Sequence, residues 1–283
     1  MSVERCGIAE ANVTGAESSA LGVFAAELKA QRQRLGWTQV ELGDKIGYSG
    51  SFISDVERCE RTPSVDFAQR CDKEMGVPGT FVRLQELTRR EAYPSWFYPV
   101  IPLEREAVRI HAWELGSVPG LLQTEEYARA HIRSGRPQDS DDDIDRLVAA
   151  RLSRQEILTG DHPPLLWCVI DEGVLRHLVG GPVVMSAQLD RLIDAARMPG
   201  IVLQLLPFGA IDHPGADGPI TVYEMAEVPA VAYTECYSGG RIVEGHAEVS
   251  SLMTVVNMIR ASALAPPESR ELIRRIRSEI NDQ

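Results

Sequence analysis

Between residues 45 and 61 the chain gathers hydroxyl, carboxylate and cationic side chains that could meet a nucleic acid. Serine hydroxyls can donate or accept hydrogen bonds at a base edge, and three are present, on Ser49, Ser51 and Ser54. The Asp55 carboxylate can accept a hydrogen bond from cytosine N4. Basic side chains bind phosphate oxygens, and this stretch offers Lys45, Arg58 and Arg61. Two simpler interpretations stay open: Asp55 pairs with a basic neighbour such as Arg58, and the cations are solvated surface charges.

A second group of polar side chains lies where predicted strands end in the C-terminal part. Asp171 and Glu172 follow the apolar run 165–170, and a Gly/Pro-rich loop after the run 201–206 holds His213 and Asp217. Loops at the carboxyl ends of strands often form a crevice. We therefore predict a pocket for a small molecule or a peptide, lined by these four residues and by Gln123. Two alternatives to a role in the pocket remain. His213 could form hydrogen bonds with backbone groups of its own turn, and Asp217-Gly218 could be a pair of turn residues.

Acidic and histidine side chains of this kind can also catalyse reactions or hold a metal ion. The sequence contains no H-E-x-x-H, no G-x-S-x-G, no P-loop and no dinucleotide-binding glycine pattern. We therefore predict a protein that is not an enzyme and uses no cofactor or metal. The acidic run 139–143 is predicted to be a solvated loop before a helix over 144–158, with divalent-metal chelation as the alternative. Arg151 and Arg154 are interpreted as ion-pair partners on that helix rather than ligand-binding groups.

The elements that must position the first group are short helices. Apolar residues recur at helical spacing from Leu21 to Leu35, and Gly36 ends that helix. Thr38 to Glu41 is a capping box that opens a second helix, and Ser49 can cap a third. A fourth helix follows Ser64 and a fifth begins near Thr80. Residues 21–90 are therefore predicted to form an all-α domain of five helices.

Residues 39–58 fit the template of a helix-turn-helix motif. The template needs a small residue where the two helices cross, which is Gly43, and a residue that tolerates positive φ in the turn, which is Gly47. The inner faces need apolar side chains, which are supplied by Leu42, Ile46, Ile53 and Val56. A plain helical hairpin would need neither glycine at these positions, so the spacing favours a DNA-binding motif.

The remainder of the chain changes character. Residues 91–102 contain three prolines and four aromatic residues, so we predict a linker without regular structure whose aromatic side chains are buried against a domain. From residue 103 onward, strand-like runs over 108–112, 165–170, 201–206, 220–225 and 231–237 alternate with helical stretches. Ser238 to Arg241 reads as a hairpin turn. The expected fold is a mixed α/β domain over 103–283, and residues 1–20 are expected to be a flexible tail.

Charge is distributed unevenly along the 283 residues, which carry a net charge of −12. Residues 21–90 hold 11 Lys and Arg against 10 Asp and Glu, whereas residues 91–283 hold 17 Arg against 28 Asp and Glu. A near-neutral module can still bind DNA, with a modest phosphate-contact contribution. No signal peptide or membrane span is apparent, and the five cysteines form no C-x-x-C pair, which fits a reducing cytoplasm.

The first part resembles the Xre/Cro-type regulators in the segment from Leu35 to Arg58, followed by Arg61-Thr-Pro63. The resemblance implies a five-helix domain that binds operator DNA as a dimer. It implies that Gln39 touches phosphate and supports the recognition helix, with Lys45 and Arg58 as candidate phosphate contacts. The residues that match groove-facing positions are Ser49, Gly50, Ser51, Ser54 and Asp55. None of these is an Arg or Asn, which could make a bidentate base contact.

The second part is similar to the WhiJ-like regulators of actinobacteria, in which an Xre-type domain precedes a domain of undefined function. The matching segments are 118–128, 150–155, 171–176, 188–192, 206–208 and 213–219. This resemblance implies transcriptional control, a high-GC actinobacterial source and a small acidic partner protein encoded nearby, as in an antitoxin pairing.

We predict that the protein is a cytoplasmic transcriptional regulator that binds double-stranded DNA, as a dimer by the resemblance. Its second domain is predicted to serve in sensing or dimerisation and to respond to a small-molecule effector or a partner protein. The alternative is an antitoxin-like interaction module in which DNA binding is secondary. The last helix carries isoleucines on one side and Arg270, Arg274 and Arg277 on another. It is expected to pack on its own domain, with a dimer contact as the alternative.

Overall fold

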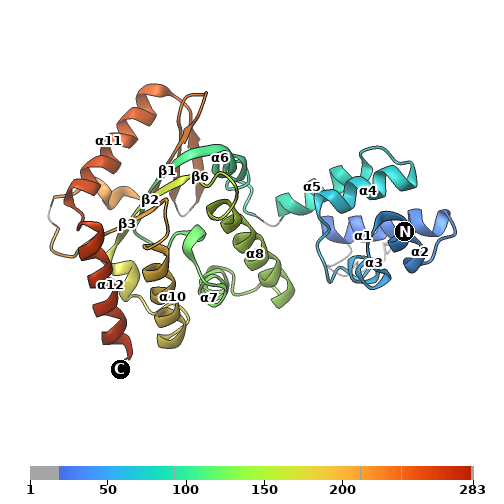
Figure 1. The fold of residues 1–283 in the computed structure, drawn as a ribbon, viewed down its shortest axis with the longest axis horizontal. Helices are drawn as coiled ribbons and strands as arrows, with labels where there is room; N and C mark the ends of the chain where they lie inside the picture. The colour runs from blue at the N-terminus through green and yellow to red at the C-terminus, as the bar shows by residue number, and fades with distance from the viewer. Residues whose placement is uncertain (1–18, 92, 211, 237, 282–283) are drawn as a thin grey trace, which may run out of the picture. The chain divides into compact units, whose positions relative to one another are not determined.

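The protein is described by a computed structural model that covers residues 19–91, 93–210, 212–236 and 238–281. Two compact units are present; the first ends at Tyr93 and the second begins at Pro94. The first is all-α and the second is mixed α/β, which confirms the predicted fold class (Figure 1). The predicted tail over residues 1–20 lies outside the described residues except at its end, where Ser19 caps the first helix and Ala20 is already helical. The helices of the first unit are α1 (Ala20–Arg34), α2 (Gln39–Ile46), α3 (Gly50–Glu57), α4 (Val65–Met75) and α5 (Thr80–Glu91).

Local signals in the sequence start and stop these helices as expected. The capping box of α2 is complete, since the Thr38 side chain accepts from Glu41 N and the Glu41 carboxylate accepts from Thr38 N. Ser49 caps α3 by accepting from Phe52 N. Asp72, which is buried, caps α5 from a distance by accepting from Phe81 N at 2.8 Å and Val82 N at 3.1 Å. These caps satisfy backbone donors that would otherwise be unpaired at the helix ends.

Around one sheet, the second unit arranges its strands in the order β3-β2-β1-β4-β5-β6. The β1–β2 and β2–β3 pairs are parallel, and the other pairs are antiparallel. In β1, Ile110 and Ala112 face one apolar layer, whereas Trp113 faces the other. The strands are β1 (Ala107–Glu114), β2 (Leu165–Asp171), β3 (Ile201–Leu206), β4 (Ile220–Met225), β5 (Val231–Cys236) and β6 (Gly239–Val243).

Helices cover both faces of this sheet. In Figure 1, α10 and α12 lie against one face of the sheet and α11 against the other. The larger apolar layer includes side chains of α10, α12 and η1, and the smaller layer takes its helical side chains from α11. Ile273, Ile276 and Ile280 of α12 are buried in the larger layer, so the last helix does pack on its own unit. The helical elements are α6 (Val100–Glu106), η1 (Gly120–Leu122), α7 (Glu125–Gly135), α8 (Asp141–Ser153), η2 (Arg154–Leu158), α9 (Glu172–Arg176), α10 (Pro182–Ala195), η3 (Pro214–Asp217), α11 (His246–Ser262) and α12 (Pro266–Asn281).

In the segment 91–102 the prediction of no regular structure was wrong at both ends. Helix α5 runs on to Glu91, and α6 begins at Val100 and contains Pro102. Proline is compatible with the first turn of a helix, because the N–H that it lacks has no partner there. Phe97 packs within the second unit, with its ring 5.7 Å from that of Tyr233 and beneath the Arg154 guanidinium. The prediction that the aromatic side chains are buried was wrong for Trp96, which is exposed.

The structure also differs from the predicted loop over 139–143 and the predicted hairpin turn over 238–241. The acidic run 139–143 is helical from Asp141, because Ser140 caps α8 and three aspartates sit in its first turn, where the helix dipole favours them. Four arginines pair with acids of this region: Arg129 with Asp145, Arg133 with Asp141, Arg136 with Asp139 and Arg146 with Asp143. The turn predicted at 238–241 is wrong beyond Ser238, because Gly239 to Arg241 already pair with β5.

Among the described residues, no helix is both long and apolar enough to cross a membrane.

Candidate nucleic-acid interface and a cavity in the second unit

Two glycines allow α2 and α3 to cross closely. A Cβ atom on Gly43 would lie 2.5 Å from Tyr48 O, which is backbone and cannot yield. A Cβ atom on Gly50 would lie 2.8 Å from Val40 Cγ2, so the first residue of α3 touches α2. Gly47 ends α2 with φ of 75°, a conformation that glycine adopts without strain. The crossing geometry of a helix-turn-helix is therefore built into these positions.

The N-terminal end of α3 is exposed and carries hydroxyl groups. Ser49 and Ser51 are exposed, and their Oγ atoms are 2.9 Å apart. The Ser49 hydroxyl also accepts from Phe52 N at 3.2 Å. The exposed Ser51 hydroxyl can rotate away from Ser49 toward another partner. In a helix-turn-helix protein, the first residues of the second helix are those that contact base edges.

Asp55 and Arg58 form the ion pair that the sequence offered as an alternative. Arg58 Nη2 lies 2.8 Å from Asp55 Oδ1 and 2.6 Å from Glu60 Oε2, and Nη1 contacts the Ser54 hydroxyl. The hydrogen bond with Glu60 raises the pKa of Arg58 and lowers that of Glu60. Lys45 is 3.5 Å from Glu74 and lies over the Trp37 ring. These exposed pairs are weak, and both cations can exchange their partners for phosphate.

A buried network fixes α3 to α1 and α2. The Arg32 guanidinium of α1 makes two hydrogen bonds with the Glu57 carboxylate, at 2.6 and 2.8 Å, and a third to Trp37 O at 2.8 Å. Gln39 of α2 donates to Glu57 Oε2 at 2.9 Å, so it also holds α3 in place. The side chains of Arg32 and Glu57 are 11% and 5% exposed, and the hydrogen bond with Glu57 raises the pKa of Arg32.

Sequence reasoning did not identify Arg32 and Glu57. A signal for Arg32 was present, because it lies four residues after Leu28 and three before Leu35, on the apolar stripe of α1. A charged residue on such a stripe is buried only with a partner. Glu57, four residues after the buried Ile53, is that partner.

Four of the five residues predicted for a pocket use their polar atoms to hold local structure. Gln123 is buried, donates to Val118 O at 2.7 Å and accepts from Arg151 Nη1 at 3.0 Å. Asp171 caps α9 by accepting from Gly173 N. Two further side chains hold neighbouring segments in the same way: Glu172 accepts from Arg176 Nε and Phe208 N, and His213 accepts from Gly215 N.

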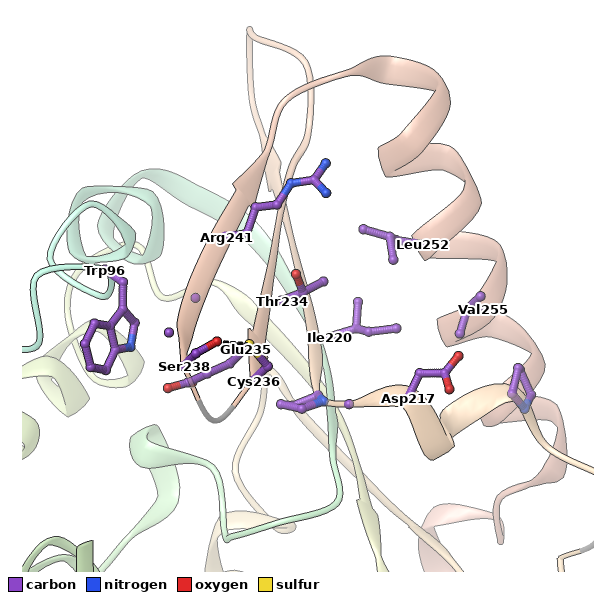
Figure 2. A pocket seen from close by; sticks show the side chains of 15 residues that line it. Trp96, Asp217, Ile220, Thr234, Glu235, Cys236, Ser238, Arg241, Leu252 and Val255 are labelled. Carbon is purple, nitrogen blue, oxygen red and sulfur yellow. Dashed lines mark hydrogen bonds between the residues drawn. The ribbon is translucent and has the colours of Figure 1, made fainter.

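Asp217, the fifth of these residues, lines a cavity of about 570 Å³ in the second unit. The cavity lies between η3, the ends of β4 and β5, the strand β6 and the helix α11, and Figure 2 shows its wall. Its apolar lining comes from Ile220 and from Leu252 and Val255 of α11. Its polar lining includes Thr234, Glu235, Cys236, Ser238 and Arg241, and Trp96 lies at its margin. The four other predicted residues are not among those that line this cavity.

The wall of this cavity is held by two close backbone approaches. Gly215 lies against the indole of Trp113, whose Nε1 donates to Gly215 O at 2.8 Å, and this contact anchors η3 on the sheet. A Cβ on Gly240 would lie 2.1 Å from the Tyr233 hydroxyl, so only glycine lets β6 close over that ring. Burial and the neighbouring Glu235 carboxylate raise the pKa of Tyr233.

Among the described carboxyl groups, Glu114 at the end of β1 has the pKa farthest from its ordinary value. Burial raises its pKa to about 8, the nearby Glu235 carboxylate adds to this shift, and Arg154 and Arg151 oppose it. Arg154 is itself paired with Glu104 at 2.6 Å, and both of those side chains are at most 10% exposed. Shifted carboxyl groups are common at functional sites and in structural ion-pair networks alike.

The close crossing of α2 and α3 is that of a helix-turn-helix, the motif of DNA-binding regulators. A family model described as helix-turn-helix matches residues 28–82. A second model, described as a domain of unknown function (DUF5753), matches residues 98–275. This match covers more than half of the chain, so the protein belongs to the DUF5753 family. Neither description names a catalytic activity. The comparison with curated proteins returned no match, and neither did the comparison with solved structures.

Proposed function

We propose that this protein is a sequence-specific transcriptional regulator that places the N-terminal end of α3 in the major groove of DNA. The observation that carries the proposal is the Arg32–Glu57–Gln39 network. It fixes α3 from its buried side, while Ser49 and Ser51 stay exposed at its leading end. A fixed helix with a polar exposed end is what direct readout of base edges requires.

Within this proposal the side chains divide into two roles. Ser51, Ser54 and Asp55 read base edges, and Gly50 allows the backbone of α3 to come close to them. Gln39, Lys45 and Arg58 bind phosphates, and Ser49 caps the helix beside them. Arg58 must then leave Glu60, which keeps its contribution to affinity modest.

A single motif of this kind reads only a few base pairs, so we infer a homodimer that binds two half-sites about one helical turn apart. The protein acts in the cytoplasm, where its DNA is found. We also infer that the protein is one of the WhiJ-like regulators of actinobacteria, because several segments of its second part are similar to theirs.

The second unit is proposed to control DNA binding through an effector or a partner protein. Its cavity and its acidic composition support this role. An antitoxin-like module that binds a partner first and DNA second is the rival account.

Selection from a randomised duplex library tests the proposal directly. The full-length protein is expected to enrich a motif with two related half-sites, spaced by about 10 base pairs between centres. Enrichment of a single half-site would contradict the dimer. No enriched motif at all would contradict the regulator and favour the rival account, in which the purified chain lacks its partner.

A further inference from the structure

We propose that the cavity between β4–β6, η3 and α11 binds a small organic cation with an apolar body. Its volume of about 570 Å³ falls within the usual range for small-molecule sites, roughly 300–1,000 Å³. Figure 2 shows Leu252 and Val255 of α11 opposite the hairpin of β5 and β6, with Asp217 at one end of the wall.

The charges around the cavity decide the sign of the ligand. Asp217 and Glu235 both line it and are exposed, and within the described residues neither forms an ion pair. The lining also contains a cation, Arg241, whose Nη2 lies 2.5 Å from the carboxylate of Glu248, so this cation comes with a counter-charge of its own. The carboxylates of Asp217, Glu235 and Glu248 outnumber this one cation, so the cavity attracts cations and repels anions. The excess of acidic residues over 91–283 adds to the same potential.

The walls decide the shape of the ligand. Ile220 is buried beneath the cavity, and Leu252 and Val255 are half-buried, so their apolar surface is covered further when a molecule enters. Trp96 is 39% exposed at the margin of the cavity, across the β5–β6 hairpin from α11 (Figure 2), and its aromatic face attracts cations. An ammonium group on an aromatic or branched body satisfies both requirements, whereas a hydrated metal ion would leave the apolar wall unused.

A native thiol reports on this cavity. Cys236 lines it and is exposed, whereas the other described cysteines are buried or half-buried. The hydrogen bond with Ser238, 3.3 Å away, lowers the pKa of Cys236, which increases the fraction of the reactive thiolate. Alkylation of Cys236 by iodoacetamide, followed by peptide mass spectrometry, therefore measures access to the cavity. The reagent is neutral, so the acidic potential does not repel it.

The experiment compares three probes of nearly equal shape: 2-phenylethylamine, which is a cation at neutral pH, 2-phenylethanol and 3-phenylpropionate. Ligands of this size bind with millimolar Kd, so each is titrated to about 20 mM. The amine is expected to slow alkylation of Cys236 by about tenfold at ten times its Kd, with much less protection from the alcohol and the carboxylate. Cys59, in the other unit, is the internal control.

Variants separate charge recognition from simple filling of the cavity. In the double variant Asp217→Asn, Glu235→Gln, the amine is expected to protect Cys236 from alkylation no better than the alcohol does. Glu227→Gln, an exposed acid outside the cavity lining, is expected to behave as the wild type. The proposal would be overturned if all three probes protected Cys236 equally or if the amine gave no protection. It would also be overturned if the amine still protected Cys236 fully in the double variant. Regulation by this ligand rests on the proposed function, but occupancy is measured without DNA, so the two can fail separately.

Discussion

Replacing Glu57 with alanine is expected to destabilise the first unit by about 3–5 kcal/mol, the usual effect of removing one partner from a buried ion pair. The substitution leaves the buried Arg32 guanidinium without the two hydrogen bonds to Glu57 and frees Gln39. Hydrogen exchange of peptides from α1 to α3, measured in the full chain, gives the change in unfolding free energy.

Two further variants make this result specific. Glu60→Ala removes an exposed acid three residues away and is expected to change stability by no more than about 0.5 kcal/mol. The double variant Arg32→Met, Glu57→Leu is expected to regain most of the loss, because the orphaned charge causes it. If Glu57→Ala were as stable as Glu60→Ala, the network would not hold α3, and the proposal would lose its main support.

Replacing Glu114 with glutamine is expected to change how the stability of the second unit depends on pH. The folded pKa is about 8 against an ordinary value of 4.5, so the folded state keeps a proton that the unfolded state loses. The stabilisation is complete below about pH 4.5 and is lost as pH rises toward and through 8. As pH rises from 4.5 to 9, the free energy of unfolding of Glu114→Gln should therefore increase by about 3–5 kcal/mol relative to that of the wild type.

Urea unfolding followed by tryptophan fluorescence measures this difference, since three of the four tryptophans lie in the second unit, namely Trp96, Trp113 and Trp167. Glu227→Gln serves as the matched control and is expected to follow the wild type at every pH. Parallel pH profiles for the wild type and Glu114→Gln would show that the Glu114 carboxyl group titrates normally.

Local signals explain why the first unit was predictable. The capping box at Thr38, the positive φ at Gly47 and the close approach at Gly43 are each set by a few neighbouring residues. Such signals can be read without knowing the rest of the fold. Glu57 was missed because its partners are distant: Arg32 lies 25 residues before it, and no local pattern joins the two.

Non-local contacts explain why the pocket was harder to predict. Polar residues after strands were expected to converge, but Gln123, Asp171, Glu172 and His213 are occupied by backbone donors and acceptors nearby. The cavity instead uses Glu235 and Cys236 from a hairpin and Leu252 from a helix. Only the pairing of β4, β5 and β6 and the placement of α11 bring these residues to Asp217. Strand order of this kind cannot be read from residue spacing.

The central claim is that α3 reads DNA sequence, and fluorescence anisotropy tests it most directly. The full-length protein is titrated against a duplex that carries the selected motif and against a scrambled duplex, at low and moderate salt. Binding to the selected duplex is expected to be at least about a hundredfold tighter. Ser51→Ala and Asp55→Ala should weaken that binding by about tenfold while leaving the scrambled duplex unaffected. Equal affinity for the two duplexes, or variants indistinguishable from the wild type, would contradict sequence recognition by α3.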